Sequence, residues 1–353
     1  MREFGSEHST ITLPDGYFEN LNNFGRKITY LRSGREALLY VACNCKLDER
    51  GVILLPSYCC WSMSAPFAKS GWNISYYKLK EDLTIDEEYL IKLLNNCKVD
   101  AILTMNFFGS ASTDNAIRLV KEFWSNIIVI EDFSHCTFSI KKIFNPAIDY
   151  YVSSIRKSIG VCDGAVVLSK EVMNPAYMGK EIKDFSDRRA IAQKMKSQYT
   201  YTKDQDIKKS FLSEIKFCEG LIDEFDLPRP ISVKARNMLH LVNGGNIAFA
   251  RRENMKHLIS LLGGKVKMLP GLERCLDGAP FSLPILVENR DDVQYRLSKS
   301  GVYAPVLWPI SDDARQICSV SACMADHMLS IPIDQRYDWD DIEEIARIVL
   351  SCV

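Results

Sequence analysis

Residues 148–169 read IDYYVSSIRKSIGVCDGAVVLS, and this segment decides the fold. Two short apolar runs, 150–152 and 165–168, predict buried strands on either side of a polar loop that carries Lys157. Such a loop places Lys157 at the rim of a core, where desolvation lowers the pKa of an amine and frees it as a nucleophile. A lysine that forms a Schiff base needs such a place. Ser154 precedes Lys157 by three residues, so hydroxyl and amine are predicted on the same side of a turn.

A second segment upstream, NIIVIEDFSH at 126–135, predicts a buried parallel strand followed by two acids and a histidine. Ligands of open α/β sheets bind at the carboxyl ends of such strands. A buried acid that stays ionised needs a cationic partner, and a protonated pyridine nitrogen is one. An acid of this kind together with a Schiff-base lysine is typical of pyridoxal phosphate chemistry. We therefore predict pyridoxal 5'-phosphate between Asp132 and Lys157, although each residue alone has an ordinary explanation as a strand-end cap or a solvated loop lysine.

Composition bounds the class of protein. The chain has 353 residues, 47% of them hydrophobic, and a formal net charge of −1, which indicates a globular protein without a nucleic-acid partner. No segment is apolar enough to cross a membrane, and the polar N-terminus at 1–8 argues against a signal peptide. The twelve cysteines have irregular spacings, so we expect buried free thiols, no metal site and a cytoplasmic location.

The stretch Ser33-Gly34-Arg35 opens a helix-like run and offers a site for an anion. Free backbone N–H groups and the positive end of the helix dipole suit a phosphate at such a position. The alternative is an ordinary helix cap at Ser33. Elsewhere apolar strands alternate with helices, which predicts a mostly parallel α/β sheet.

Several motifs in one order carry a resemblance to a known family. They lie at 33–38, 52–57, 106–109, 130–135, the Lys157 loop, 301–309 and 329–334. In this order the chain resembles the DegT/StrS-type sugar aminotransferases, which are fold-type-I pyridoxal phosphate enzymes. The resemblance implies a large domain with a mostly parallel seven-stranded sheet and a smaller C-terminal α+β domain. It covers most of the chain except about 171–245.

The resemblance also implies roles for individual residues. Gly34, Arg35 and Glu36 would contact the cofactor phosphate through their backbone, and Ser154 is the candidate side-chain ligand, with Ser153 as the fallback. The remaining implied cofactor contacts are Cys60 at the ring, Asp132 at the ring nitrogen, His135 near the phenolic oxygen and Lys157 as the covalent attachment.

Three departures from the family pattern indicate a divergent branch. Val152 stands where the family often has the phosphate serine, and Ala165 replaces a glycine. Cys60 stands where an aromatic residue usually stacks on the ring, so either Cys60 packs there or the neighbouring Trp61 shifts in. Position alone suggests Tyr17, Trp308 and Arg315 for the acceptor pocket.

The domain organisation follows from the same patterns. We predict a large cofactor-binding domain at 1–245 and a small domain at 246–353, joined by a helix at 245–262. Two charged helices at 180–197 and 203–225 form an insertion at about 171–230, which either covers the site, builds a dimer or is simply a solvated face. In the small domain we expect strands at 281–287 and 303–308.

The resemblance implies an aminotransferase. Its amino donor would be glutamate and its acceptor a keto-sugar nucleotide, in cell-surface polysaccharide or related biosynthesis, and the enzyme would be a homodimer. Two alternatives remain at this point: a sugar dehydratase, against which Lys157 argues because those relatives carry histidine there, and a non-catalytic cofactor-binding or regulatory protein on the same scaffold.

Overall fold

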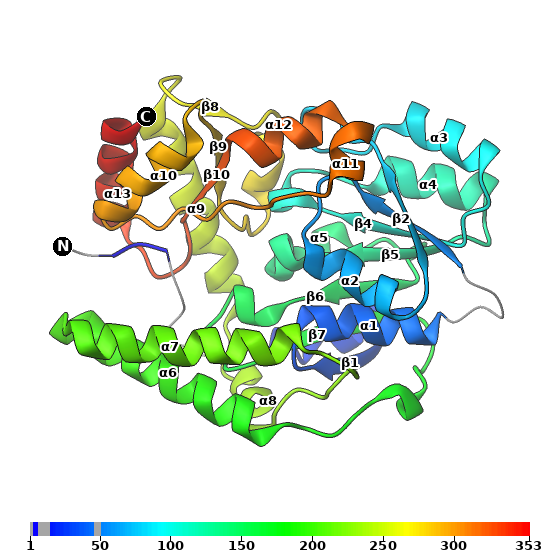
Figure 1. Cartoon of the computed structure of the whole chain (residues 1–353), viewed down its shortest axis with the longest axis horizontal. Helices are drawn as coiled ribbons and strands as arrows, with labels where there is room; N and C mark the ends of the chain where they lie inside the picture. Colours follow the sequence, from blue (N-terminus) through cyan, green and yellow to red (C-terminus); the bar gives the residue numbers. More distant parts are fainter. Residues whose placement is uncertain (1–2, 6–14, 46–50) are drawn as a thin grey trace.

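The computed structural model describes residues 3–5, 15–45 and 51–353. Its strands form two sheets, a seven-stranded one and a three-stranded one, which are well separated in Figure 1. The predicted α/β fold is confirmed. Most of the polar N-terminal stretch at 1–8 lies outside the described residues, and none of the described helices is long and apolar enough to cross a membrane.

The large sheet has the order β1-β7-β6-β5-β4-β2-β3. Its strands are β1 (Lys27–Leu31), β2 (Val52–Pro56), β3 (Asn73–Tyr77), β4 (Ala101–Met105), β5 (Ile128–Asp132), β6 (Tyr150–Ser153) and β7 (Ala165–Ser169). Strands β3, β2, β4, β5 and β6 pair in parallel, whereas β7 is antiparallel to both of its neighbours. The central strands are apolar and buried, because helices cover both faces of a parallel sheet.

The small sheet is antiparallel, in the order β10-β9-β8. Its strands are β8 (Lys267–Met268), β9 (Leu283–Leu286) and β10 (Met328–Ile331). Helices α9 and α13 contact each other, and α10 contacts α13 and β10. The predicted boundary at residue 245 falls in the first turn of α9, and the division into two domains stays a prediction.

The helices fall into two groups along the chain. The first accompanies the large sheet: α1 (Gly34–Asn44), α2 (Trp61–Lys69), α3 (Glu87–Asn96), α4 (Asp114–Phe123) and α5 (Ile140–Ile143). The second comprises α6 (Lys183–Thr202), α7 (Gln205–Asp223), α8 (Val233–Leu239), α9 (Gly244–Leu262), α10 (Arg290–Lys299), α11 (Asp312–Ile317), α12 (Ser319–His327) and α13 (Trp339–Cys352).

Both predicted insertion helices form, as α6 and α7, which lie side by side in a long hairpin (Figure 1). The hairpin has two small apolar clusters of its own, one around Phe185, Cys218 and Ile222 and one around Tyr199 and Phe211. These clusters are separate from the main core, so polar contacts carry much of the attachment of the hairpin to the body.

The strand expected at 303–308 is wrong. Residues 303–308 have no ladder of their own; the Tyr303 N–H donates to the Phe4 carbonyl at 2.8 Å, and the Ser330 N–H donates to the Pro305 carbonyl at 3.1 Å. Pro305 has no N–H to offer a ladder, so this apolar stretch runs alongside β10 without joining the sheet.

Candidate active site

A cavity lies at the carboxyl ends of β4, β5 and β6, where the sequence predicts a ligand. Segments far apart in the chain meet in its wall. The residues that line it are Ser33, Gly34, Arg35, Leu38, Cys60, Ser62, Met63, Met105, Asp132, Ser134, Ser154, Arg156, Lys157, Ile222 and Trp308. Seven of these are residues predicted from the sequence, namely Gly34, Arg35, Cys60, Asp132, Ser154, Lys157 and Trp308.

Asp132 is the last residue of β5 and is 6% exposed. Its Oδ1 accepts a hydrogen bond from the Ser134 N–H at 2.8 Å. Burial raises the pKa of Asp132, and the positive charge of Lys157 opposes that rise. Both residues line the same cavity, so the charge of Lys157 acts on the Asp132 carboxylate across it. A cofactor between the two would need this arrangement.

Lys157 ends a short turn, Ile155–Lys157, directly after β6. Its N–H donates to the Ser154 carbonyl at 3.3 Å, so the two predicted residues share this turn. The expected desolvation of Lys157 is wrong, because its side chain is exposed. Lys157 lines two cavities.

The start of α1 forms the other end of the cavity. Ser33 caps the helix, and its Oγ accepts the Glu36 N–H at 3.3 Å. A Cβ added to Gly34 would lie 3.0 Å from Ser154 Cβ. Glycine therefore allows the start of α1 to lie this close to Ser154. The Ser154 N–H donates to Ser134 Oγ at 2.9 Å, which brings both hydroxyls to the helix start. This group of donors suits a phosphate.

Glu36 does not line the cavity. Its side chain is fully buried, with Arg32 Nε 2.9 Å from Glu36 Oε2 and Ser33 Oγ 2.8 Å from the same atom. Burial raises the pKa of Glu36 despite these donors. The side chain stabilises the turn before α1, and the predicted backbone contact of Glu36 with a cofactor phosphate stays a prediction.

His135 lies behind the cavity wall and is 2% exposed. Its ring stacks on Phe281 with centroids 4.5 Å apart and on Trp308 at 5.4 Å. Burial lowers the pKa of His135 well below its ordinary value, and Lys157 adds to the effect. The neutral ring accepts the Phe108 N–H at Nδ1, which leaves the proton on Nε2. Its predicted role near a phenolic oxygen stays a prediction.

Cys60 stands in the cavity wall, whereas Trp61 does not. Cys60 Sγ lies 2.9 Å from Ser62 Oγ. Trp61 is 58% exposed, and its ring lies 5.2 Å from the guanidinium carbon of Arg35. Of the two alternatives, only Cys60 lines the cavity, and its contact with a cofactor ring stays a prediction.

Two predicted acceptor residues lie outside the cavity. The Tyr17 hydroxyl donates to the Thr137 carbonyl at 2.6 Å, and the ring packs on Phe138. Arg315 forms a two-pronged ion pair with Asp326, at 2.7 and 3.0 Å. Because of these contacts, neither side chain points into the cavity beside Lys157.

The sequence did not single out three further parts of the wall. Ser134 stands two residues after Asp132, and Arg156 directly precedes Lys157, so proximity in sequence was the available signal. Ile222 comes from α7, in the insertion, and no local pattern places it at the site. The fallback Ser153 bonds Thr137 Oγ1 at 2.7 Å, facing away from the cavity wall.

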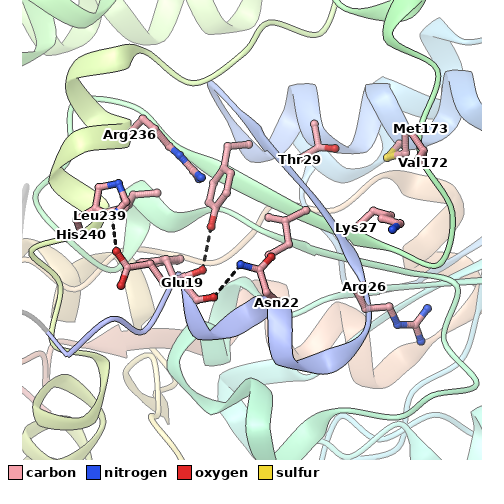
Figure 2. A pocket seen from close by; sticks show the side chains of 13 residues that line it. Glu19, Asn22, Arg26, Lys27, Thr29, Val172, Met173, Arg236, Leu239 and His240 are labelled. Carbon is pink, nitrogen blue, oxygen red and sulfur yellow. Dashed lines mark hydrogen bonds and ion pairs between the residues drawn. The ribbon is translucent and has the colours of Figure 1, made fainter.

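A separate cavity lies beside the edge strand β1, between η1 (Asn20–Phe24) and α8 (Figure 2). His240 and Glu19 pair at one side of it, and Arg236 lies over the Tyr30 ring at 3.6 Å. None of the predicted site residues lines it.

Solved structures identify the class of fold. The chain matches Helicobacter pylori PseC, an aminotransferase involved in the biosynthesis of pseudoaminic acid, with a TM-score of 0.69 and 16% identity over 99% of each chain. It matches a DegT DnrJ EryC1 StrS aminotransferase from Brucella abortus with a TM-score of 0.64 and 14% identity, over 94% of this chain and 88% of that one.

A third match, the sugar aminotransferase CalS13 from Micromonospora echinospora, has a TM-score of 0.63 and 14% identity over 95% of this chain and 90% of that one. No family model matches the chain, and no curated protein matches it in sequence. The chain therefore has the fold of the DegT/DnrJ/EryC1/StrS sugar aminotransferases over nearly its full length, as the resemblance predicted, at an identity that marks it as divergent.

Proposed function

We propose that this protein is a pyridoxal-phosphate-dependent aminotransferase. One observation carries the proposal: Gly34, Asp132, Ser154 and Lys157, from four separate segments, line a single cavity at the carboxyl edge of the sheet. The open approach at Gly34 provides a place for a phosphate, and an acid and a lysine face the same space. These residues fit the cofactor.

The cofactor, when bound, supplies an electron sink for the carbanion formed at the substrate. Lys157 would hold it covalently and then take and return the proton that moves during amino transfer. Asp132 would keep a proton on the ring nitrogen. The hydroxyls of Ser134 and Ser154 and the N-terminus of α1 would bind the phosphate, with Arg35 and Arg156 adding positive charge.

We further propose glutamate as the amino donor and a keto-sugar nucleotide as the acceptor, in cell-surface polysaccharide or related biosynthesis. The support is the fold shared with sugar aminotransferases. A cytoplasmic homodimer is part of the same proposal, and light scattering on the purified protein tests the dimer.

The direct test is covalent trapping. Borohydride reduction of the purified protein loaded with pyridoxal phosphate should add the reduced cofactor to the peptide that contains Lys157, detected by mass spectrometry. Lys157→Ala should abolish the label and the visible absorption of the bound cofactor. Lys141→Ala, at an exposed lysine of α5, is the matched control and should keep both. Label on another lysine would refute the assignment.

A second measurement separates an aminotransferase from a binding protein. Adding glutamate to the loaded protein should convert the cofactor spectrum to that of the aminated form, and a panel of keto-sugar nucleotides should convert it back. An unchanged spectrum with glutamate and with other amino donors would favour a non-catalytic, cofactor-binding role.

A further inference from the structure

Strand β1 lies at one edge of the large sheet, and only part of its outer side is covered. A single bridge, between Leu31 and Pro230, covers its carboxyl end, where the Ile231 N–H donates to the Tyr30 carbonyl at 3.2 Å. The chain then turns into α8, which begins at Val233, so no described segment pairs with the outer side of the strand before Tyr30. An unpaired strand edge is a template for another strand.

The backbone of Ile28 faces this open edge. The Tyr30 carbonyl points outward, because it accepts the Ile231 N–H, and the backbone groups of alternate residues in a strand point to the same side. The N–H and C=O of Ile28 and the N–H of Tyr30 therefore point away from β7. None of the three forms a hydrogen bond with another part of the described chain. They offer two donors and one acceptor to a further strand.

The open edge lies in the cavity shown in Figure 2, which forms a groove between η1 and α8. The groove has a volume of about 510 Å³, and Ile28 and Tyr30 are among the residues that line it. Phe18 and Leu239 provide apolar surface, and the side chain of Val172 is 75% exposed. Walls on both sides of β1 favour a single extended segment over the edge of a second folded sheet.

The groove carries positive charge without an ion pair. Arg236 lies over the Tyr30 ring, with the guanidinium carbon 3.6 Å from the ring centroid. Neither Arg236 nor the exposed Lys27 has a carboxylate within ion-pair distance among the described residues. The acid in the wall, Glu19, is paired with His240. The groove should therefore attract an acidic segment.

The two cations flank the edge from opposite faces of the sheet. Side chains alternate along a strand, and Lys27 and Tyr30 are 30 − 27 = 3 positions apart, so their side chains lie on opposite faces. Arg236 covers the face of Tyr30, and a guanidinium stacked on a ring keeps its N–H edge for a carboxylate. An added strand would meet both cations if it carried two acids at the same odd spacing.

We propose that the outer edge of β1 binds an extended acidic segment of a partner protein, which adds to the large sheet as a further strand. Hydrogen bonds to the backbone of Ile28 and Tyr30 would set the register, and Lys27 and Arg236 would select acids. A second copy of this chain is a poorer occupant, because a symmetric pair of β1 strands would bring the cations of both copies together.

Fluorescence anisotropy with the full chain and a labelled synthetic peptide provides the test. The peptide alternates valine and threonine and carries two glutamates three positions apart. It should bind saturably, and a peptide with lysines in place of the glutamates should bind at least about tenfold more weakly. Lys27→Gln and Arg236→Gln should each weaken binding of the acidic peptide about three- to tenfold. Arg347→Gln, at an exposed arginine of α13, should bind as the wild type does.

Methylation of peptide nitrogens separates strand addition from attraction between charges alone. In a bound strand one alternate set of nitrogens faces β1 and the other faces away, so methylation of one set should abolish binding and methylation of the other should not. This comparison needs no protein variant. Ile28→Pro removes an outward N–H without removing a bond to β7, and it should also weaken binding. Thermal melts show whether each variant is folded.

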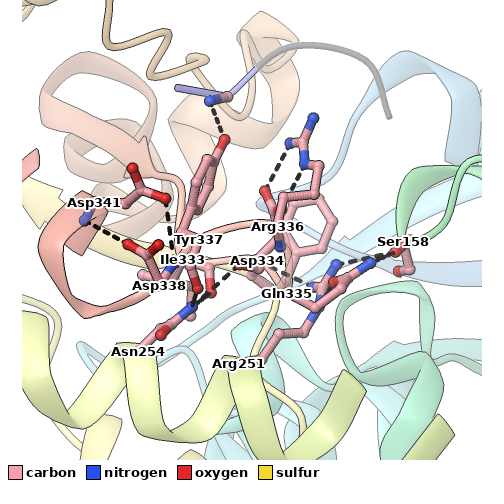
Figure 3. Close-up of polar contacts among 12 residues, drawn as sticks. Ser158, Arg251, Asn254, Ile333, Asp334, Gln335, Arg336, Tyr337, Asp338 and Asp341 are labelled. Carbon is pink, nitrogen blue, oxygen red and sulfur yellow. Dashed lines mark hydrogen bonds and ion pairs between the residues drawn. The ribbon is translucent and has the colours of Figure 1, made fainter. Parts of the chain in front are cut away.

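The groove is separate from the candidate active site. None of its residues lines the cavity beside Lys157. The loop after Lys157 is held from another direction, because Arg251 Nη2 and Gln335 Nε2 both donate to the Ser158 carbonyl, at 3.2 and 3.0 Å (Figure 3). Borohydride labelling of Lys157 should therefore be the same in Lys27→Gln and Arg236→Gln as in the wild type.

Equal binding of the acidic and basic peptides, or no binding of either, would overturn the proposal. Equal effects of the two methylation patterns, or wild-type affinity in Lys27→Gln and Arg236→Gln, would overturn it as well. Dimerisation of the wild type that is lost in Ile28→Pro, without peptide binding, would overturn it in favour of a second copy of the chain. Sedimentation at several concentrations measures that dimerisation.

Discussion

Glu219 of α7 binds the guanidinium of Arg156, the residue before Lys157, through Nη1–Oε1 and Nη2–Oε2 distances of 2.8 and 3.1 Å. The same carboxylate accepts a hydrogen bond from Arg189 of α6 at 2.9 Å. One acid of the insertion therefore joins both helices of the hairpin to the loop of the candidate active site. The neighbouring Ile222 closes that cavity from the same helix.

Glu219→Gln should loosen the α6–α7 hairpin. The substitution removes the charge that two arginines share, and the hairpin has little apolar contact with the main core to compensate. Because Glu219 is about a third exposed, we expect a loss of only about 1–2 kcal/mol in the free energy of unfolding. Hydrogen exchange in 205–223 should rise. Asp206→Asn, on the exposed start of α7, is the control, and equal exchange in both variants would contradict the role of Glu219.

Gly34→Ala should weaken cofactor binding without unfolding the protein. The added Cβ would lie 3.0 Å from Ser154 Cβ and 3.4 Å from Ser154 Oγ, so the hydroxyl must move. Overpacking of this kind costs about 1–3 kcal/mol, and if the cost falls on the bound state it corresponds to roughly fivefold to 150-fold in affinity for pyridoxal phosphate. Titration followed by absorbance measures it.

Gly220→Ala is the matched substitution, because nothing lies within 4 Å of a Cβ at that position in α7. It should raise the free energy of unfolding by about 0.5–1 kcal/mol and leave cofactor affinity unchanged. A loss of affinity in both alanine variants would show that the effect is not local to the Ser154 contact.

Glu131→Gln should flatten the pH dependence of stability. Burial raises the pKa of Glu131 to about 7, and the hydroxyls of Thr104 and Thr113 only partly oppose this. The unfolded carboxyl has its ordinary pKa of 4.5, so the folded state holds the extra proton between these values. Stability therefore falls as pH rises from about 4.5 to 7, and the full cost, on the order of 3 kcal/mol, is present above pH 7.

Glutamine resembles the protonated acid, so the variant should gain stability at pH 8 relative to pH 5, as urea denaturation at both values measures. Burial also raises the pKa of Asp163, to about 6. Asp163 therefore also lowers stability as pH rises, and the Glu131→Gln variant should keep this smaller pH dependence of stability. Asp163→Asn removes that residual part. An unchanged slope in Glu131→Gln would show that its carboxyl is ionised throughout.

Asp132→Asn should separate cofactor attachment from amino transfer. Asparagine keeps an oxygen for the Ser134 N–H but has no negative charge to hold a proton on the ring nitrogen. We expect the borohydride label on Lys157 to remain and the rate of the glutamate half-reaction to fall on the order of 10²-fold or more. Stopped-flow absorbance measures the rate. A rate close to that of the wild type would remove Asp132 from the chemistry.

Local patterns predicted most elements of this fold. The apolar runs of β4, β5, β6 and β7 and the helices of the insertion lie within a few residues of their predicted ranges. The lysine and the acid were also visible, because each sits where a strand ends. The strand expected at 303–308 failed because an apolar run alone does not show whether a neighbouring strand is available to pair with it.

The exposure of Lys157 and the place of Glu36 were not predictable from their neighbours in the chain. Lys157 lines two cavities, one walled by the start of α1 and the other by residues of α9 and the small sheet. Glu36 turns inward because Arg32 lies one helical turn before it and is itself buried.

The sequence by itself determined the alternation of strands and helices, and with it the sheet edge at which Asp132 and Lys157 meet. That information is local, since hydrophobic period and strand ends depend on residues a few positions apart. Only the tertiary structure decided that α7 brings Glu219 and Ile222 to this edge and that α9 buries Arg251 beside Lys157. Those contacts join segments about 60 to 90 residues apart, so they form only when the whole chain packs together.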